Sequence, residues 1–140
     1  MNGQRDRAMP HQHMAPHLHA ETFVYCTFAD FRIPPGMNPI CTFREAEGIT
    51  AIVEKVQAER CGAPYLFESH LISLTVHSSL EAVGLLATLA RHLADADIPC
   101  NAVAGYHHDH LFVPTGQAER ALHLLSSISV PAPAGPRQPG

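Results

Sequence analysis

The stretch HLISLTVHSSLEAVGLLATLARHLADADIPCNAVAGYHHDHLFVP, residues 70–114, alternates between the hydrophobic periods of strands and helices. Apolar residues fall at every second position over 70–77, which is typical of a strand with one face in a core. They recur at helical spacing over 78–97, where Ser78 and Glu81 form an S-x-x-E capping box. Alternation returns at 98–106 and again at 110–114. The stretch therefore predicts the order β-α-β-β, with a hairpin turn at 107–109.

The residues that follow extend this order by one helix, because QAERALHLLSSI (117–128) again has helical spacing. Strands separated by such a helix are expected to pair in parallel through a right-handed crossover, with both helices on one face of the sheet. The predicted fold class is α+β, a ferredoxin-like β-α-β-β-α unit.

The first half of the chain contains the later part of a similar unit. TFVYCTF (22–28) is β-branched and aromatic and predicts a strand, and residues 30–39, with three prolines, predict a loop. Residues 40–62 favour two strand segments broken at Gly48, followed by a short helix near 54–60. Two half-complete units could share one sheet, with residues 65–77 supplying strands to both.

The ends of the chain have the composition of loose tails. Residues 1–20 are rich in histidine and proline, and 131–140 are rich in proline and glycine. We expect four parts: a flexible tail over 1–20, a first incomplete module over 21–66, a second module over 67–130, and a flexible tail over 131–140. His11, His13, His17 and His19 form two HxH pairs that could chelate a transition metal only adventitiously without a packed second shell.

Composition excludes several classes of protein. The formal charge of -4 gives no broad cationic surface, so we expect no nucleic-acid partner. No apolar run reaches the roughly 20 residues of a membrane span, and no signal peptide precedes the first strand, which predicts a cytoplasmic protein without membrane contact. The four cysteines form no CxxC pair and are expected to be free thiols.

The segment 73–114 resembles the second module of the small stand-alone tandem ACT-domain proteins of bacteria, which are similar to the ACT regulatory lobe of aspartate kinases. FVYCTF and CTFREAEGIT resemble the first module, so the likeness covers about residues 21–128. The resemblance implies two interlocked ACT-like modules, binding of an amino acid or related metabolite rather than catalysis, and a homodimer without a cofactor. The chain departs from that family in its histidine- and proline-rich start and in the doubled pair His107 and His108.

The expected ligand site lies where the strand over 70–77 meets the helix. Free backbone N–H groups at a helix N-terminus attract a carboxylate, and a glycine in the first helical turn allows close approach of a ligand or a second backbone. Asn101 on the next strand could accept a hydrogen bond from an ammonium group. An ordinary capped helix and a sheet-edge asparagine are the alternatives. The predicted ligand-binding residues are Ser78, Ser79, Leu80, Glu81, Val83, Gly84, Asn101 and Val103.

The histidines at 107, 108 and 110 favour a structural turn over a metal site, because adjacent side chains cannot all converge on one ion. Asp109 suits a turn, since its side chain can bond nearby backbone amides. We predict no catalytic residue and no metal ligand. The alternative functions are a dimerisation module without a ligand and a histidine-dependent metal enzyme.

Overall fold

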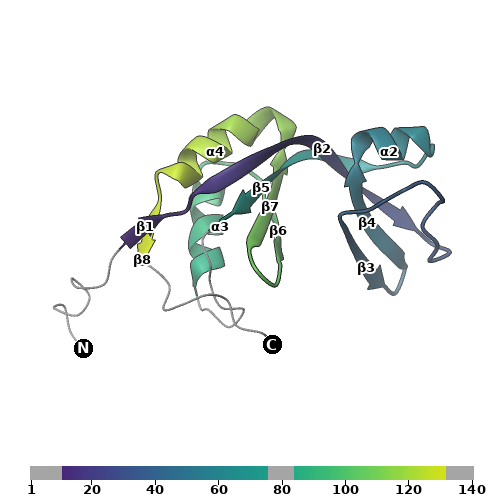
Figure 1. The fold of residues 1–140 in the computed structure, drawn as a ribbon, viewed down its shortest axis with the longest axis horizontal. Coiled ribbons are helices and arrows are strands. Elements are labelled where there is room, and N and C mark those ends of the chain that lie inside the picture. The colour runs from purple at the N-terminus through teal and green to yellow at the C-terminus, as the bar shows by residue number, and fades with distance from the viewer. Residues whose placement is uncertain (1–10, 76–83, 132–140) are drawn as a thin grey trace.

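The computed structural model describes residues 11–75 and 84–131 and confirms an α+β ferredoxin-like fold. A six-stranded antiparallel sheet has the strand order β3-β4-β2-β5-β7-β6 (Figure 1). Its strands are β2 (Pro16–Phe28), β3 (Cys41–Glu45), β4 (Gly48–Glu54), β5 (Leu66–Leu74), β6 (Asn101–Ala104) and β7 (Asp109–Pro114). The helices are α2 (Lys55–Arg60), the 3-10 turn η1 (Thr115–Gln117), α3 (Leu85–Asp95) and α4 (Ala118–Ser126).

The two modules share one continuous sheet through the long strands β2 and β5. β2 spans 13 residues and pairs with β4 on one side and β5 on the other. The predicted strands within the first half are confirmed, as are the loop over 30–39 and the short helix after β4. In Figure 1 the β3–β4 hairpin and α2 form one end of the molecule, while α3 and α4 lie at the other.

Residues 11–20 do not form a tail, so the predicted flexible segment over 1–20 is wrong for that part. β1 (His11–His13) pairs with β8 (Ser129–Pro131) in a separate two-stranded sheet, and the first residues of β2 pair with the end of β5. The physical reason is apolar burial, since Met14 is fully buried and Leu18 packs against the same core. Pro16 stands at the first position of its strand, where the missing N–H is tolerated.

The expected parallel pairing across the α3 crossover does not occur. β7 lies between β5 and β6, and it pairs antiparallel with both. The reason is the difference in hydrophobicity: Leu111, Phe112 and Val113 of β7 are buried on both faces, whereas most of β6 is exposed. The strand that needs two covered faces takes the interior position, and the predicted β6–β7 hairpin is confirmed.

Helices pack on one face of the sheet and leave the other face without them. α3 and α4 bury Leu89, Leu93 and Leu125 against Ile72 and its neighbours, and Ala58 of α2 joins a second cluster with β2 and β4. A third cluster consists only of strand residues: Phe23, Ile52, Leu71 and Phe112, flanked by Tyr25, Cys41, Phe67 and Val103. The surface over this third cluster is called the helix-free face below.

Candidate functional site

Most of the predicted strand-to-helix site cannot be placed. Ser78, Ser79, Leu80, Glu81 and Val83 lie outside the described residues, as does the expected capping box. The part of this site that the structure does describe is Gly84, at the start of α3.

Gly84 precedes the helix instead of lying within its first turn, which corrects the sequence-based expectation. Its φ of 91° is in the left-handed region, which a right-handed helix excludes and which glycine adopts at little cost. Its carbonyl accepts the first bond of the helix from the Thr88 N–H at 2.9 Å. Apart from its chain neighbours, no heavy atom of the residues that the structure describes lies within 4 Å of a Cβ built at this glycine, so these residues leave the space beside it open.

The two predicted residues on β6, Asn101 and Val103, lie on the helix-free face and not beside α3. Asn101 pairs with Phe112 and Val103 with His110, and paired residues in a sheet share a face. Phe112 belongs to the strand-only cluster, whereas Leu111, the partner of Ala102, packs under the helices. The structure therefore separates these two residues from the helix start.

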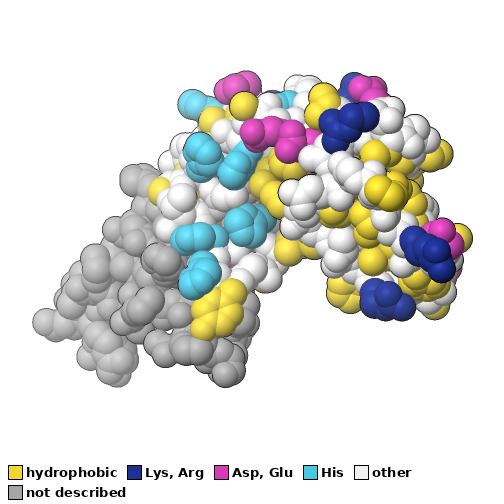
Figure 2. Space-filling view, turned by 45° about the vertical axis from the view of Figure 1, so that its right-hand side comes forward, with side chains coloured by type: hydrophobic (Ala, Val, Ile, Leu, Met, Phe, Trp, Pro, Cys, Tyr) yellow, Lys and Arg dark blue, Asp and Glu magenta, His cyan; other side chains and the backbone are white. Residues whose placement is uncertain are grey.

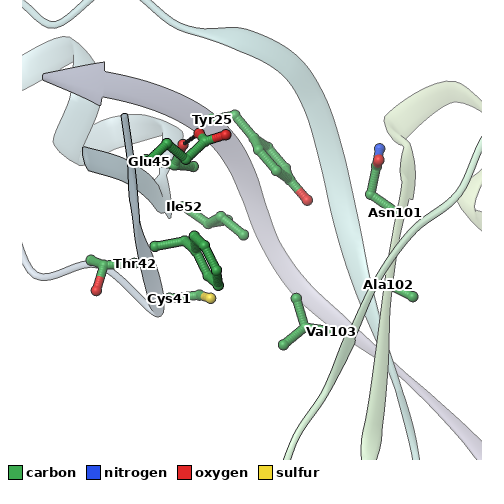
Figure 3. A pocket seen from close by; sticks show the side chains of 10 residues that line it. Tyr25, Cys41, Thr42, Glu45, Ile52, Asn101, Ala102 and Val103 are labelled. Carbon is green, nitrogen blue, oxygen red and sulfur yellow. Dashed lines mark hydrogen bonds between the residues drawn. The ribbon is translucent and has the colours of Figure 1, made fainter. Parts of the chain in front are cut away.

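Asn101 and Val103 instead line a pocket on the helix-free face, with a volume of about 440 Å³ (Figure 3). The pocket is lined by residues of β2, β3, β4 and β6: Tyr25, Cys41, Thr42, Phe43, Glu45, Thr50, Ile52, Asn101, Ala102 and Val103. Sequence reasoning missed the lining residues on β2, β3 and β4. Local sequence patterns do not reveal that the two edges of a sheet approach each other.

Tyr25 connects this pocket to the aromatic cluster beneath it. Its ring meets Phe67 and Phe112 edge to face, with centroids 5.7 and 5.8 Å apart. Burial raises the pKa of Tyr25 to about 12, with smaller contributions from the thiols of Cys41 and Cys100. The phenol is therefore neutral at physiological pH and can donate a hydrogen bond. Figure 3 shows its oxygen directed across the pocket toward the Asn101 side.

The histidines form part of a hydrogen-bonded row across three strands. Ser73 Oγ lies 2.8 Å from both His19 Nε2 and His110 Nδ1. The ring of His17 meets His19 at 4.6 Å between centroids. Figure 2 shows histidine side chains gathered in a band on the face of the molecule turned toward the viewer. Among the described residues no three His, Cys, Asp or Glu side chains are arranged to hold a metal ion.

The hairpin turn between β6 and β7 covers residues 105–108, so it begins two residues earlier and ends one residue earlier than expected. The Gly105 N–H donates to the His108 carbonyl at 2.9 Å, and Asp109 is already the first residue of β7. Asp109 is buried, which corrects its predicted place in the turn. His107 contacts the Tyr106 ring at 4.7 Å between centroids. The Gly105–His108 hydrogen bond and the contact between the Tyr106 and His107 rings are consistent with a structural role for this turn.

The chain matches two adjacent ACT-domain family models, at residues 11–70 and 66–127. A Vibrio cholerae protein of unknown function, described as a possible transport protein, is 42% identical, with a TM-score of 0.74 over 84% of this chain and 91% of the other. An Agrobacterium tumefaciens protein is 13% identical, with a TM-score of 0.69 over 81% of this chain and 87% of the other.

The regulatory subunit of aspartate kinase from Thermus thermophilus, in its ligand-free form, is also similar in fold. It is 11% identical, with a TM-score of 0.60 over 79% of this chain and 92% of the other. No curated protein sequence matches the chain.

The fold and these matches define a class of single chains in which two ferredoxin-like regulatory units share one sheet. The chain belongs to the ACT-domain family, with two ACT domains in tandem. ACT domains are typically regulatory ligand-binding units rather than catalytic ones. No helix in the described ranges is long and apolar enough to cross a bilayer.

Proposed function

We propose that this protein is a small cytoplasmic regulatory protein that binds an amino acid or a related metabolite at the strand-to-helix segment 78–84, as a homodimer. The observation that carries the proposal is the left-handed Gly84 at the start of α3, within a tandem ACT fold. A partner copy would supply the remainder of the pocket at the interface between modules.

The helix start suits the carboxylate of an amino acid for electrostatic reasons. The first N–H groups of a helix lack acceptors within the helix, and the helix dipole favours an anion there by about 0.3–1 kcal/mol. The hydroxyls of Ser78 and Ser79 and the amides of Leu80 and Glu81 are the proposed additional donors, with Val83 as an apolar contact. The open space beside Gly84 permits close approach.

The test is a thermal shift screen of the full chain against amino acids and related metabolites in the presence of a chelator. A ligand at a hundred times its Kd stabilises the folded state by about 2.7 kcal/mol, which corresponds to several degrees in Tm. We expect a selective shift that Gly84→Ala reduces or abolishes.

Gly62→Ala is the matched control for this experiment. Gly62 also has a positive φ, of 67°, and within the described ranges no atom lies within 4 Å of a Cβ built there, so the backbone strain is comparable. Gly62→Ala should lower Tm but preserve the ligand-induced shift. Equal loss of the shift in both variants, or no shift with any compound, would contradict the proposed site.

The second candidate is a dimerisation module without a ligand. β3 is an edge strand of the sheet, and the side chain of Phe43 on it is 71% exposed. An exposed edge strand that carries an apolar side chain can pair with a second copy. A stable dimer that Phe43→Lys dissociates, with no compound giving a thermal shift, favours this function.

A further inference from the structure

The pocket on the helix-free face is unusual because the two edges of one sheet line it together. β3 is the first strand of the sheet order and β6 is the last, yet Cys41 of β3 and Asn101 of β6 border the same pocket. The sheet therefore curls over its helix-free face. Figure 3 shows the side chains of Cys41, Ile52 and Val103 converging between the two edges.

The floor of the pocket is apolar. Ile52 is 4% exposed and belongs to the strand-only cluster, against which Cys41 and Val103 pack. Phe43 adds an exposed aromatic ring to the wall. Removal of such surface from water favours binding, so an apolar ligand body is suited to this floor.

Glu45 is the one charged side chain among the described residues that line the pocket, and these residues include no lysine, arginine or histidine. One Glu45 carboxylate oxygen accepts a hydrogen bond from the Thr50 hydroxyl, and its second oxygen remains available to a ligand. The hydroxyl of Tyr25 has no hydrogen-bond partner within residues 11–75 and 84–131, although its ring is held by Phe67 and Phe112.

We propose that this pocket binds a small cationic amine with a ring-sized apolar body. The body lies on Ile52 and Val103, and the ammonium group donates to the Glu45 carboxylate. An attached hydroxyl or carbonyl would satisfy the Tyr25 phenol or the Asn101 amide. A carboxylate-bearing ligand is disfavoured, because the described part of the lining provides no cation to oppose the Glu45 charge. The described residues that line this pocket differ from those proposed for the effector site at 78–84.

The probe is phenethylamine, titrated calorimetrically into the full chain, with phenylacetate as the ring-matched anion. We expect saturable binding of phenethylamine and none of phenylacetate. Glu45→Gln and Tyr25→Phe test the two polar groups. Glu45→Gln removes the charge and should weaken phenethylamine binding by about two- to tenfold. Tyr25→Phe removes one hydrogen bond and should weaken tyramine binding by about the same factor.

Glu47→Gln is the matched control for charge, because Glu47 is exposed in the same hairpin but does not line the pocket. It should bind phenethylamine like the wild type. Tyr25→Phe is compared with tyramine as the probe, whose hydroxyl can bond the phenol. Equal effects of Glu45→Gln and Glu47→Gln would overturn the assignment of the ammonium group.

A footprint locates the binding independently of these variants. Cys41 lines the pocket, whereas Cys61 belongs to the cluster under α2. Phenethylamine should slow alkylation of Cys41 by iodoacetamide at least twofold and leave Cys61 unchanged. Binding without protection of Cys41, equal binding of phenylacetate, or no binding at all would overturn the proposal.

Discussion

Gly48→Ala should destabilise the protein strongly, because the backbone of β2 leaves no space for a methyl group there. Gly48 has a φ of 155°, and a Cβ built on it would lie 2.6 Å from the Phe28 carbonyl oxygen and 3.1 Å from the Ala29 Cα. Both contacts are with backbone atoms, so no side-chain rotation can relieve them. Glu45 pairs with Gly48 at the end of the β3–β4 hairpin, and the whole hairpin must shift.

The expected loss is about 2–4 kcal/mol, from about 1–3 for backbone strain and a further 1–3 for overpacking that is partly relieved by movement of the hairpin. For a domain of this size that corresponds to roughly 6–16 °C in Tm. Urea unfolding followed by circular dichroism measures the free energy difference.

Gly116→Ala is the control for this prediction. Gly116 has no positive φ, and none of the atoms in 11–75 and 84–131 lies within 4 Å of a Cβ built there, so its replacement should change stability by less than about 0.5 kcal/mol. If Gly48→Ala were as stable as Gly116→Ala, the hairpin geometry described for β2, β3 and β4 would be wrong.

Three further outcomes follow from the core and the titratable groups. Leu93→Ala, at a fully buried position on α3, should cost about 2–5 kcal/mol in urea unfolding, whereas Leu66→Ala, 76% exposed, should be nearly neutral. Burial and the charge of His17 lower the pKa of His19, so the unfolded chain protonates first. This contribution to stability is complete above about pH 6.5 and is lost as the pH falls through the lowered folded pKa; His19→Gln should flatten that part of the stability profile. Burial raises the pKa of the Cys26 thiol, so iodoacetamide should label Cys26 at neutral pH only as fast as the protein opens, and a rate independent of denaturant would refute this.

Local periodicity was sufficient to predict five elements of the second module, but neither the short strand β8 nor the residue at which α3 begins. Alternation over 70–77 and helical spacing over 117–128 correspond to β5 and α4, and the short β6–β7 connection corresponds to a hairpin. These patterns arise from contacts close in sequence, and they define which face of each element is apolar.

Strand order and the start of β2 were not predictable in the same way. β7 takes the interior position because both its faces are buried, a property that depends on what lies on either side of it. Residues 16–20 resemble a tail in composition, yet Leu18 pairs with Ile72 of β5, more than 50 residues away. Histidine and proline content carries no information about such a distant partner.

In the candidate site, too, the local backbone feature was predictable and the long-range arrangement was not. Glycine at position 84 indicated a special backbone position, and its left-handed conformation gives that choice of residue a physical basis. Asn101 and Val103 were predicted beside the helix start but line the pocket on the helix-free face. Their side-chain direction depends on register with β7, and a shift of one residue reverses it.

Hydrogen–deuterium exchange of the full chain, with and without the amino acid that gives the largest thermal shift, tests the effector-binding proposal most directly. We predict that the ligand slows exchange in the peptide covering 78–88 and that Gly84→Ala removes this protection. The peptides covering 41–45 and 101–104 should remain unchanged. Protection confined to those two peptides, or absent throughout at saturating concentrations of every amino acid, would contradict an effector site at the start of α3.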